Sequence, residues 1–331
     1  MRGNTIFVLF CVLLIMCGCD KNSVTNPDKT DTNPFLENNT LNVENVRYAS
    51  IDRNSLGYLK IYDDKNLDIQ SIKAAYINVN HPFFVETGVY WNLDENQIPV
   101  VKYGFGDYYN PVTTTHTALG FYRDYKNYSL PKDSLGFVNN AEWLINNSNE
   151  DGYIPYEFDF SHDIHELPAY EWSSAMAQGG ALAVMCQAYV FTNDEKYLAA
   201  AEKFFRTLYM NTGSLWCIVV DKDGYYWHEE YPNPDFCHVL NGMLYSIWGL
   251  WDYYVITDDP FALTLFLAGI RSIADNIDSY NIEGVNSSKY CMHKSDPLEP
   301  YHPLHIALLE LYLEWFEIPE FREAIEILTS E

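Results

Sequence analysis

Two adjacent carboxylates, Glu229 and Glu230, stand beside Tyr231 in the segment WHEEYP. Pro232 and Pro234 prevent a helix from running through the pair, because proline lacks a backbone N–H and restricts the residue before it. A strongly apolar segment, VLNGMLYSIWGLW, follows with large side chains at three- and four-residue spacing. Acidic groups on a rigid turn at the start of a buried helix are well placed for proton transfer. A solvated acidic loop is the alternative interpretation of the same residues.

The C-terminal two thirds of the chain must position these groups, and its pattern is helical from Asn110 onward. Helix starts are marked by Asp194 before Glu195 and by Asp259 before Pro260. The predicted helices span residues 111–126, 134–148, 171–192, 194–211, 236–257, 260–279, 302–317 and 319–329. Short connections favour antiparallel pairs around a common axis, so we expect a mainly α fold, an α/α barrel that is toroid-like and either complete or incomplete. No tight internal repeat is visible.

Short β-like runs precede the helices. Residues 58–62, 83–90 and 98–103 alternate with turn residues and predict a small β-rich entry segment. A β-hairpin is expected where residues 215–220 and 225–228 flank the turn sequence DKDG. We therefore divide the chain into a signal peptide (1–19), a flexible linker (20–41), the β-rich segment (42–103) and the α/α domain (104–331).

The first residues resemble a bacterial lipoprotein signal. Arg2 gives a weakly basic start, Ile6–Met16 is a short apolar run, and the sequence MCGC ending at Cys19 resembles a lipobox. By this resemblance Cys19 carries the lipid, which anchors the protein to a membrane of the cell envelope, periplasmic or surface-exposed. An ordinary cleaved signal peptide is the alternative, and both place the protein outside the cytoplasm. The following polar residues predict a flexible tether.

The amino-acid composition limits the classes of molecule that the protein is expected to bind. Lys and Arg number 20 against 46 Asp and Glu, a net charge of −26, which argues against nucleic acid. An anionic substrate would need a local cationic pocket, which salt screening permits. The 27 Tyr and 8 Trp suit a carbohydrate cleft, where flat rings cover sugar faces.

Four cysteines follow Cys19, namely Cys186, Cys217, Cys237 and Cys291. In an oxidising compartment they could form two disulfides in three possible pairings, and buried free thiols are equally compatible with the sequence. Their spacing matches no cysteine metal site, and no HExxH pattern exists.

Several blocks together resemble the C-terminal catalytic domain of the D-glucuronyl C5-epimerase family. They are YNPVTTTHTALGFY (109–122), EWSSAMAQGGALAVMCQAY (171–189), WHEEYP (227–232), VLNGMLYSIWGLWD (239–252), the pair Lys289-Tyr290 and the triplet PYH (300–302). Their order and spacing agree with the family over about 220 residues. The combination of MAQG, EEYP and LNG-x-x-YS is specific, whereas the terminal blocks are weaker.

The resemblance implies an isomerase that inverts C5 of hexuronic acid residues, of the glucuronate or iduronate type, within a heparan-sulfate-like acidic polysaccharide. Such inversion removes a weakly acidic hydrogen beside a carboxylate and returns one on the opposite face, so two proton-transfer groups must flank the ring. The substrate carboxylate must also be neutralised. By resemblance, Glu230 and Tyr301 are the acid/base pair and Tyr231 supports them. The residues implied to bind substrate are Tyr290, His293, Lys294, Gln178, Asn241 and His116.

Departures from the family pattern bear on the substrate. Three residues after Tyr290, where better-known members carry an Arg that engages the uronate carboxylate, the chain has His293 followed by Lys294. A second Gln of the family is Gly180 here, and a Gln of the first block is His116. The large β domain of animal members has no room in this chain. An altered or lost activity therefore stays open.

The resemblance implies no organic cofactor and a homodimer. A Ca²⁺ site associated with the family's β region cannot be placed, since Asn92–Asn96 is only suggestive. Three other classes also fit the residues: a uronate polysaccharide lyase, a helical toroid glycoside hydrolase that uses two carboxylates, and a non-catalytic surface glycan-binding lipoprotein.

Overall fold

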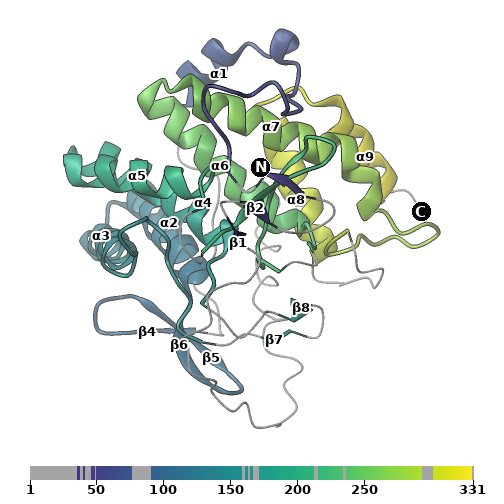
Figure 1. Cartoon of the computed structure of the whole chain (residues 1–331). Coiled ribbons are helices and arrows are strands. Elements are labelled where there is room, and N and C mark those ends of the chain that lie inside the picture. The colour runs from purple at the N-terminus through teal and green to yellow at the C-terminus, as the bar shows by residue number, and fades with distance from the viewer. Residues whose placement is uncertain are drawn as a thin grey trace.

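A computed structural model gives the arrangement of the chain (Figure 1). It describes residues 36–37, 40–41, 46–48, 50–76, 91–158, 161–162, 165–166, 171–211, 215–233, 236–292 and 301–329. The predicted lipidation site Cys19, the pair His293-Lys294 and the run 83–90 lie outside these residues. Within the described part, no helix is both long and apolar enough to cross a membrane.

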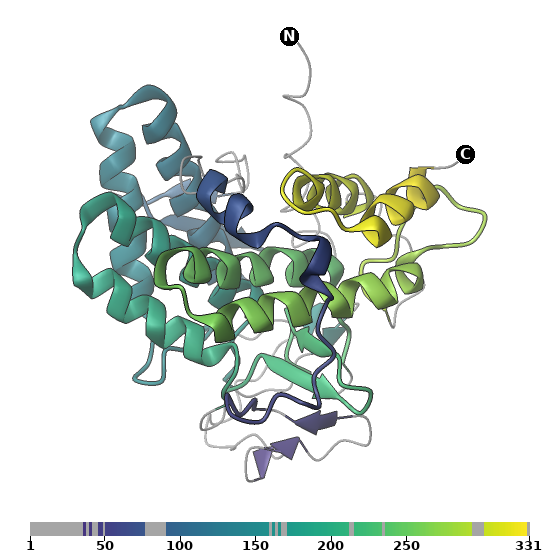
Figure 2. The same ribbon diagram turned by 90° about the horizontal axis from the view of Figure 1, so that it is seen from above.

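Four consecutive helix pairs dominate the part of the chain that the structure describes. They are α2 (Pro111–Tyr128) with α3 (Pro131–Asn146), α4 (Ala175–Thr192) with α5 (Glu195–Thr207), α6 (Leu240–Thr257) with α7 (Pro260–Asn276), and α8 (Tyr301–Leu313) with α9 (Pro319–Thr329). The first helices of successive pairs also pack on one another. Seen from above, the pairs cross the molecule in chain order, from blue-green to yellow (Figure 2). The fold is therefore mainly α, with the paired helices of an α/α toroid, as the sequence predicted.

The turns inside three of these pairs share one structure. Ser129, Asn193 and Asp258 follow α2, α4 and α6 with φ of 55°, 56° and 57°, and each donates its N–H to a tyrosine carbonyl four residues back. The next residue is extended and begins the partner helix. Left-handed residues of this kind end helices by satisfying a free carbonyl. The segments are YKNYSLP, YVFTNDE and YVITDDP. The similarity therefore lies in the backbone of the turn, and the three segments share little sequence beyond the tyrosine.

Helices α4 and α6 cross at the centre of the molecule. Both are apolar on nearly every side and almost completely buried, as expected of helices without a solvent face. Gly179 of α4 and Gly249 of α6 bring the two backbones into contact. A Cβ added at Gly249 would overlap the carbonyl oxygen of Gly179, and one added at Gly179 would overlap that of Ser246. The absence of side chains at these two positions therefore fixes how closely the helices approach.

The β structure is small and lies beside the helices. A three-stranded antiparallel sheet has the order β10-β9-β3, and a second has the order β4-β5-β6. The strands are β3 (Val46–Tyr48), β9 (Ile218–Asp221), β10 (Tyr226–His228), β4 (Trp91–Leu93), β5 (Pro99–Tyr103) and β6 (Gly106–Tyr109). Two-residue strands pair as β1 (Leu36–Glu37) with β2 (Thr40–Leu41) and as β7 (Ser161–His162) with β8 (His165–Glu166). The β9–β10 hairpin is the one predicted around DKDG.

The predicted strand over residues 58–62 is wrong. Its N–H groups bind carbonyls of unrelated segments, from Lys60 to Gly224 and from Tyr62 to Leu267, so the chain runs there as an extended strap without a strand partner. An unpredicted helix, α1 (Ile69–Tyr76), follows it. Two 3₁₀ turns, η2 (Asp64–Asn66) and η3 (Ile277–Tyr280), precede α1 and follow α7.

We expect Gly249→Ala to lower the free energy of unfolding by about 1–3 kcal/mol, because a methyl group would force the α4 and α6 backbones apart. Alanine's higher helix propensity, worth about 1 kcal/mol, works against this loss. Gly57→Ala is the control, since a Cβ there meets nothing within 4 Å. Denaturant unfolding measures both variants. Equal midpoints for Gly249→Ala and the wild type would show that the two helices are not held at this distance.

Candidate active site

The paired glutamates directly follow strand β10 and are held by backbone hydrogen bonds on both sides. The N–H of Glu229 donates to the carbonyl of Cys217 at 2.8 Å, and its carbonyl accepts from the N–H of Ala175 at 2.9 Å. One bond reaches the β9 side of the hairpin and the other reaches the first residue of α4. This position is therefore fixed between the small sheet and the central helix.

The Glu229 side chain serves the scaffold. It is fully buried, and its Oε1 lies 2.5 Å from Nδ1 of His238. Its Oε2 accepts from the backbone N–H groups of Cys237 and His238 at 3.3 Å each. His238 has a φ of 51° and stacks on Trp227 with ring centroids 4.3 Å apart. The carboxylate of Glu229 thus holds the loop between β10 and α6 in shape.

Glu230 points to a different neighbourhood. It is 9% exposed, and its Oε1 accepts a hydrogen bond from the Tyr290 hydroxyl at 3.2 Å. Its Oε2 is buried without a hydrogen-bond partner among the described residues. Gly242, in the first turn of α6, makes room for the carboxylate, since a Cβ there would overlap Oε2. One oxygen of Glu230 is therefore held by Tyr290, while the other lies buried against Gly242 without a hydrogen bond from the described residues.

Burial raises the pKa of the Glu230 carboxyl to about 7, well above its ordinary value of 4.5. Hydrogen bonds from Tyr231 and Tyr290 oppose this rise, and the nearby Cys291 adds to it. A group whose pKa lies near neutral pH exists in both protonation states, which general acid–base catalysis requires. Glu230 therefore has the electrostatic character of a catalytic acid or base.

Three tyrosines gather beside Glu230. The hydroxyls of Tyr231 and Tyr290 are 3.3 Å apart, and the rings of Tyr290 and Tyr301 have centroids 4.4 Å apart. Burial, reinforced by the Glu230 charge, raises the pKa of Tyr231 and of Tyr290 well above 10. Both hydroxyls are consequently protonated at neutral pH and act as hydrogen-bond donors. The structure thus brings together the predicted residues Glu230, Tyr231, Tyr290 and Tyr301. Tyr290, which was predicted to bind substrate, contacts the Glu230 carboxylate itself.

Two further predicted substrate contacts lie on the helices around this cluster. Asn241, next to Gly242 at the start of α6, is 3% exposed, and its Oδ1 has no hydrogen-bond partner among the described residues. His116 of α2 packs its ring 4.7 Å from that of Tyr245 on α6. The Asn241 amide thus has a free acceptor for a ligand, whereas His116 contributes to a wall between α2 and α6.

Gln178 does not fit its predicted role as a substrate contact. Its Nε2 donates to the carbonyl of Gly152 at 2.8 Å and to the Thr207 hydroxyl at 2.9 Å. Its Oε1 accepts from the Ile154 N–H at 2.9 Å and from the Ser173 hydroxyl at 3.1 Å. Because both donors and both acceptor positions of the amide are used and the residue is fully buried, Gln178 joins loops of the scaffold.

An aromatic wall beside the cluster was not singled out from the sequence. Tyr156 stacks on Trp172 with centroids 3.8 Å apart and planes 12° from parallel, and Trp172 lies 6.3 Å from Tyr231. The Glu230 charge also contributes to the raised pKa of Tyr156. Trp172 stands in the block EWSSAMAQ, but in a chain so rich in aromatic residues its type alone gave no signal.

The Asn92–Asn96 segment has little capacity left for a calcium ion. Asp94 accepts from the N–H groups of Asn96 and Ile98 at 2.8 Å each and from the Tyr109 hydroxyl at 3.0 Å. Such bonds stabilise a turn. Among the described residues, no group of three His, Cys, Asp or Glu side chains is arranged to hold a metal.

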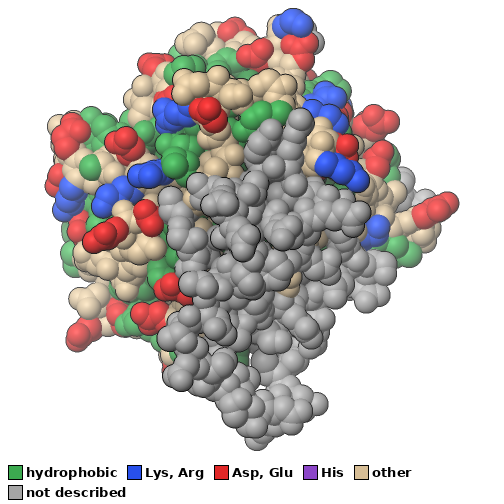
Figure 3. Space-filling view, in the orientation of Figure 1, with side chains coloured by type: hydrophobic (Ala, Val, Ile, Leu, Met, Phe, Trp, Pro, Cys, Tyr) green, Lys and Arg blue, Asp and Glu red, His purple; other side chains and the backbone are tan. Residues whose placement is uncertain are grey.

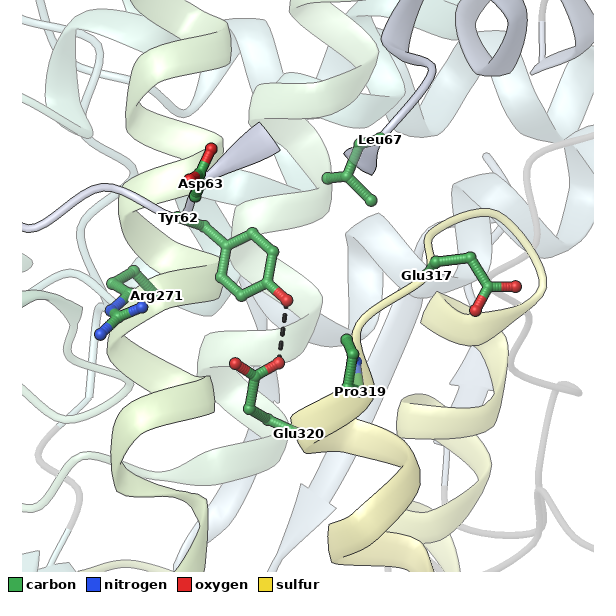
Figure 4. A pocket seen from close by; sticks show the side chains of 7 residues that line it. All are labelled: Tyr62, Asp63, Leu67, Arg271, Glu317, Pro319 and Glu320. Carbon is green, nitrogen blue, oxygen red and sulfur yellow. Dashed lines mark hydrogen bonds between the residues drawn. The ribbon is translucent and has the colours of Figure 1, made fainter. Parts of the chain in front are cut away.

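A cavity of about 310 Å³ lies elsewhere, between the strap, α7 and the start of α9 (Figure 4). Tyr62 donates to Glu320 across it at 2.8 Å, and Arg271 beside it is paired with Asp275. None of the residues around Glu230 lines this cavity. On one face of the molecule, charged side chains of both signs lie around the rim of the described surface (Figure 3). Neither feature competes with the Glu230 cluster as a catalytic centre.

Comparisons with known proteins bear on the same region. The family model described as D-glucuronyl C5-epimerase C-terminus matches residues 148–329. The D-glucuronyl C5-epimerase of Caenorhabditis elegans is 32% identical over 197 residues, which make up 54% of this chain and 32% of the worm protein. An uncharacterized protein of Methanocaldococcus jannaschii is 23% identical over 281 residues, 73% of this chain and 91% of that protein. The chain thus spans about a third of the worm enzyme's length.

Solved structures give weaker similarities. A glycoside hydrolase family 76 α-mannanase of Bacteroides thetaiotaomicron has a TM-score of 0.48 at 14% identity, covering 72% of this chain and 63% of that one. An unsaturated glucuronyl hydrolase of Streptococcus agalactiae has a TM-score of 0.44 at 14% identity, covering 65% and 57%. At these scores neither similarity bears on function.

The raised pKa of Glu230 predicts how stability depends on pH. Between the unfolded value of 4.5 and the folded value of about 7, the unfolded chain ionises this group more readily than the folded one. The contribution of Glu230 to the free energy of unfolding is therefore fully present below pH 4.5. It is lost as the pH rises to about 7, by on the order of 3 kcal/mol in total. Glu230→Gln removes this contribution, so the variant should gain stability over the wild type at pH 8 relative to pH 5.

Unfolding midpoints at the two pH values measure the difference. Glu323→Gln, at an exposed position of α9, is the matched control and should shift both midpoints alike. A Glu230→Gln difference that is the same at both pH values would mean that Glu230 ionises as it does in water.

Proposed function

Because the chain belongs to the D-glucuronyl C5-epimerase family, we propose that it inverts C5 of hexuronic acid residues, of the glucuronate or iduronate type, within a polysaccharide. The observation that carries this proposal is the buried Glu230, with a pKa of about 7 and a cluster of neutral tyrosines around it. An acidic polymer outside the cytoplasm is the proposed substrate. Lipid attachment at Cys19 and dimer formation are proposed with it, from the sequence alone.

In this reaction the ionised Glu230 removes the C5 hydrogen, and the charge that develops spreads into the substrate carboxylate. Burial strengthens the carboxylate as a base, because leaving it charged in an apolar site is unfavourable. The Tyr290 hydroxyl holds Oε1 at 3.2 Å and orients the carboxylate, and Oε2, which has no hydrogen-bond partner among the described residues, is the oxygen proposed to take the proton. General bases work best when their pKa is near the working pH, as it is here.

The second proton comes from the opposite face of the ring. Tyr301 is the proposed donor, since it begins α8, packs against Tyr290 and reaches the cluster from a different element than Glu230 does. A neutral phenol can give its proton to a carbanion-like centre and be reprotonated afterwards. The chain's own cations His293 and Lys294 are proposed to neutralise the uronate carboxylate, with charge but without the paired geometry of an arginine.

The direct test is solvent exchange. Incubated in D₂O with a glucuronan- or heparosan-like polymer, the wild type should place deuterium at C5 without cleaving the chain. Glu230→Gln should slow this by about 10²–10⁴-fold, because an amide cannot carry the proton. Glu323→Gln is the control and should exchange at the wild-type rate. Mass spectrometry of the recovered uronate counts the deuterium.

Two outcomes would replace the proposal. If exchange is accompanied by an unsaturated, ultraviolet-absorbing chain end, O4 has departed and the protein is a lyase that uses the same C5 proton abstraction. If the polymer binds and no uronate tested shows C5 exchange, the protein is a glycan-binding module.

A second prediction concerns the role of Tyr290. Its hydrogen bond lowers the pKa of Glu230, so Tyr290→Phe should raise that pKa further. Since the ionised carboxylate is the proposed base, the rise of kcat/KM with pH should move to higher pH in the variant. Tyr225→Phe, whose hydroxyl binds Asp275 on the surface, is the matched control. A Tyr290→Phe profile that falls in height without moving along the pH axis would show that Tyr290 acts on the substrate alone.

A further inference from the structure

Two buried cysteines meet beside the candidate site. The Sγ atoms of Cys237 and Cys291 are 3.0 Å apart, and the residues are 4% and 0% exposed. Unbonded carbon atoms pack at about 3.5–4.0 Å, and sulfur is larger than carbon, so the two atoms are closer than nonbonded packing allows. The structure records no disulfide bond among the four cysteines of its described part. The two side chains nevertheless lie close enough for a disulfide bond to form between them.

The backbone aligns the two cysteines across a short antiparallel bridge. Val239 pairs with Cys291, the Met292 N–H donates to the Cys237 carbonyl at 2.9 Å, and the Leu240 N–H donates to the Tyr290 carbonyl at 3.2 Å. Side chains on neighbouring antiparallel segments approach closely in such an arrangement. The two thiols therefore face each other because their segments are already paired.

We propose that Cys237 and Cys291 form a disulfide bond that holds Tyr290 against Glu230. Formation joins the two sulfurs and releases two protons and two electrons. A disulfide oxidant, either a small-molecule disulfide or an oxidised dithiol protein, accepts them and becomes the dithiol. Because the sulfurs are already 3.0 Å apart, they need to approach by only about 1 Å to reach the length of an S–S bond.

The other two cysteines lie in separate surroundings. Cys217 donates its thiol to the Thr207 carbonyl at 3.5 Å, and Cys186 lies within α4 near the Asp252 charge. Burial raises the pKa of Cys186 well above its usual value, which keeps this thiol protonated and unreactive. The sequence left two disulfides in three possible pairings and buried free thiols open, and the structure favours a single disulfide between Cys237 and Cys291 with Cys186 and Cys217 as thiols.

The bond would connect the two segments that build the site. Cys237 belongs to the loop pinned by Glu229, which directly precedes Glu230, and Cys291 follows Tyr290. Apart from the disulfide, a short backbone bridge between Val239 and Cys291 connects these two segments. A link between residues 54 positions apart in sequence also restricts the unfolded chain strongly. The brace thus acts on both the stability and the geometry of the Tyr290–Glu230 contact.

The first experiment needs no variant. The full chain is incubated with oxidised glutathione, denatured, alkylated without reduction, digested and analysed by mass spectrometry. A peptide pair linked through Cys237 and Cys291, lost on reduction, is expected, with Cys186 and Cys217 alkylated. Alkylated Cys237 and Cys291 after this treatment, or a linkage through other cysteines, would overturn the proposal.

The second experiment measures what the bond does. Reduction of the oxidised wild type should lower its thermal midpoint by roughly 3–6 °C. Cys237→Ala should start from a lower midpoint and lose its response to the reductant. Cys186→Ala removes a buried thiol without a sulfur neighbour and should keep the full response. A reductant effect that persists in Cys237→Ala would assign the stabilisation elsewhere.

The effect on catalysis rests on the proposed function and is read separately. If the protein exchanges C5 hydrogen, reduction should shift the rise of kcat/KM to higher pH, in the direction expected of Tyr290→Phe, because the Tyr290 bond to Glu230 loosens. An unchanged profile beside a confirmed linked peptide would refute the positioning role but not the disulfide. A protein without exchange activity would still be judged by the peptide and the thermal midpoint.

Discussion

The carboxylate of Glu229 is the interaction on which the site depends. Glu230 directly follows Glu229 at the end of strand β10, so whatever fixes the backbone of Glu229 also limits where the Glu230 side chain can point. Glu229 accepts hydrogen bonds from the backbone of Cys237 and His238, and its own backbone is tied to Cys217 and Ala175. Two identical side chains consequently have opposite tasks. The Glu229 carboxylate holds a loop, whereas Oε2 of Glu230 has no hydrogen-bond partner among the described residues.

Burial of Glu230 in this position lowers the stability of the fold at neutral pH and brings the pKa of the carboxyl close to 7. A buried carboxyl disfavours its own charge, and the Tyr290 hydroxyl offsets only part of that cost. Gly242 is needed as well, because a side chain at this position of α6 would occupy the space of the carboxylate. The same contacts that make the group unfavourable to ionise bring its pKa into the range where it can both take and give a proton.

Sequence patterns predicted the helices and the hairpin well, because helical spacing and capping residues such as Asp194 and Asp259 act locally. The family blocks also identified the tyrosines that meet Glu230. What could not be read from the sequence depends on long-range contacts. The four bonds of Gln178 reach three separate segments, and the strap at residues 58–62 has strand-like composition but no strand beside it. Neither the hydrogen bonds of the Gln178 amide nor the lack of a strand partner for residues 58–62 can be recognised from the neighbouring sequence.

The repeated turn of the helix pairs has a consequence for how the molecule comes together. In two of these turns, YVFTNDE and YVITDDP, an aspartate also caps the partner helix, so these helix pairs can form from nearby contacts as soon as their chain is available. The centre around Glu230 is different, because Tyr290 is 60 residues away in sequence. During synthesis the helix pairs emerge one after another, and Glu230, Tyr290 and Tyr301 meet only when the last pair, which begins at Tyr301, is added. The helix pairs therefore form before the Glu230 cluster is complete.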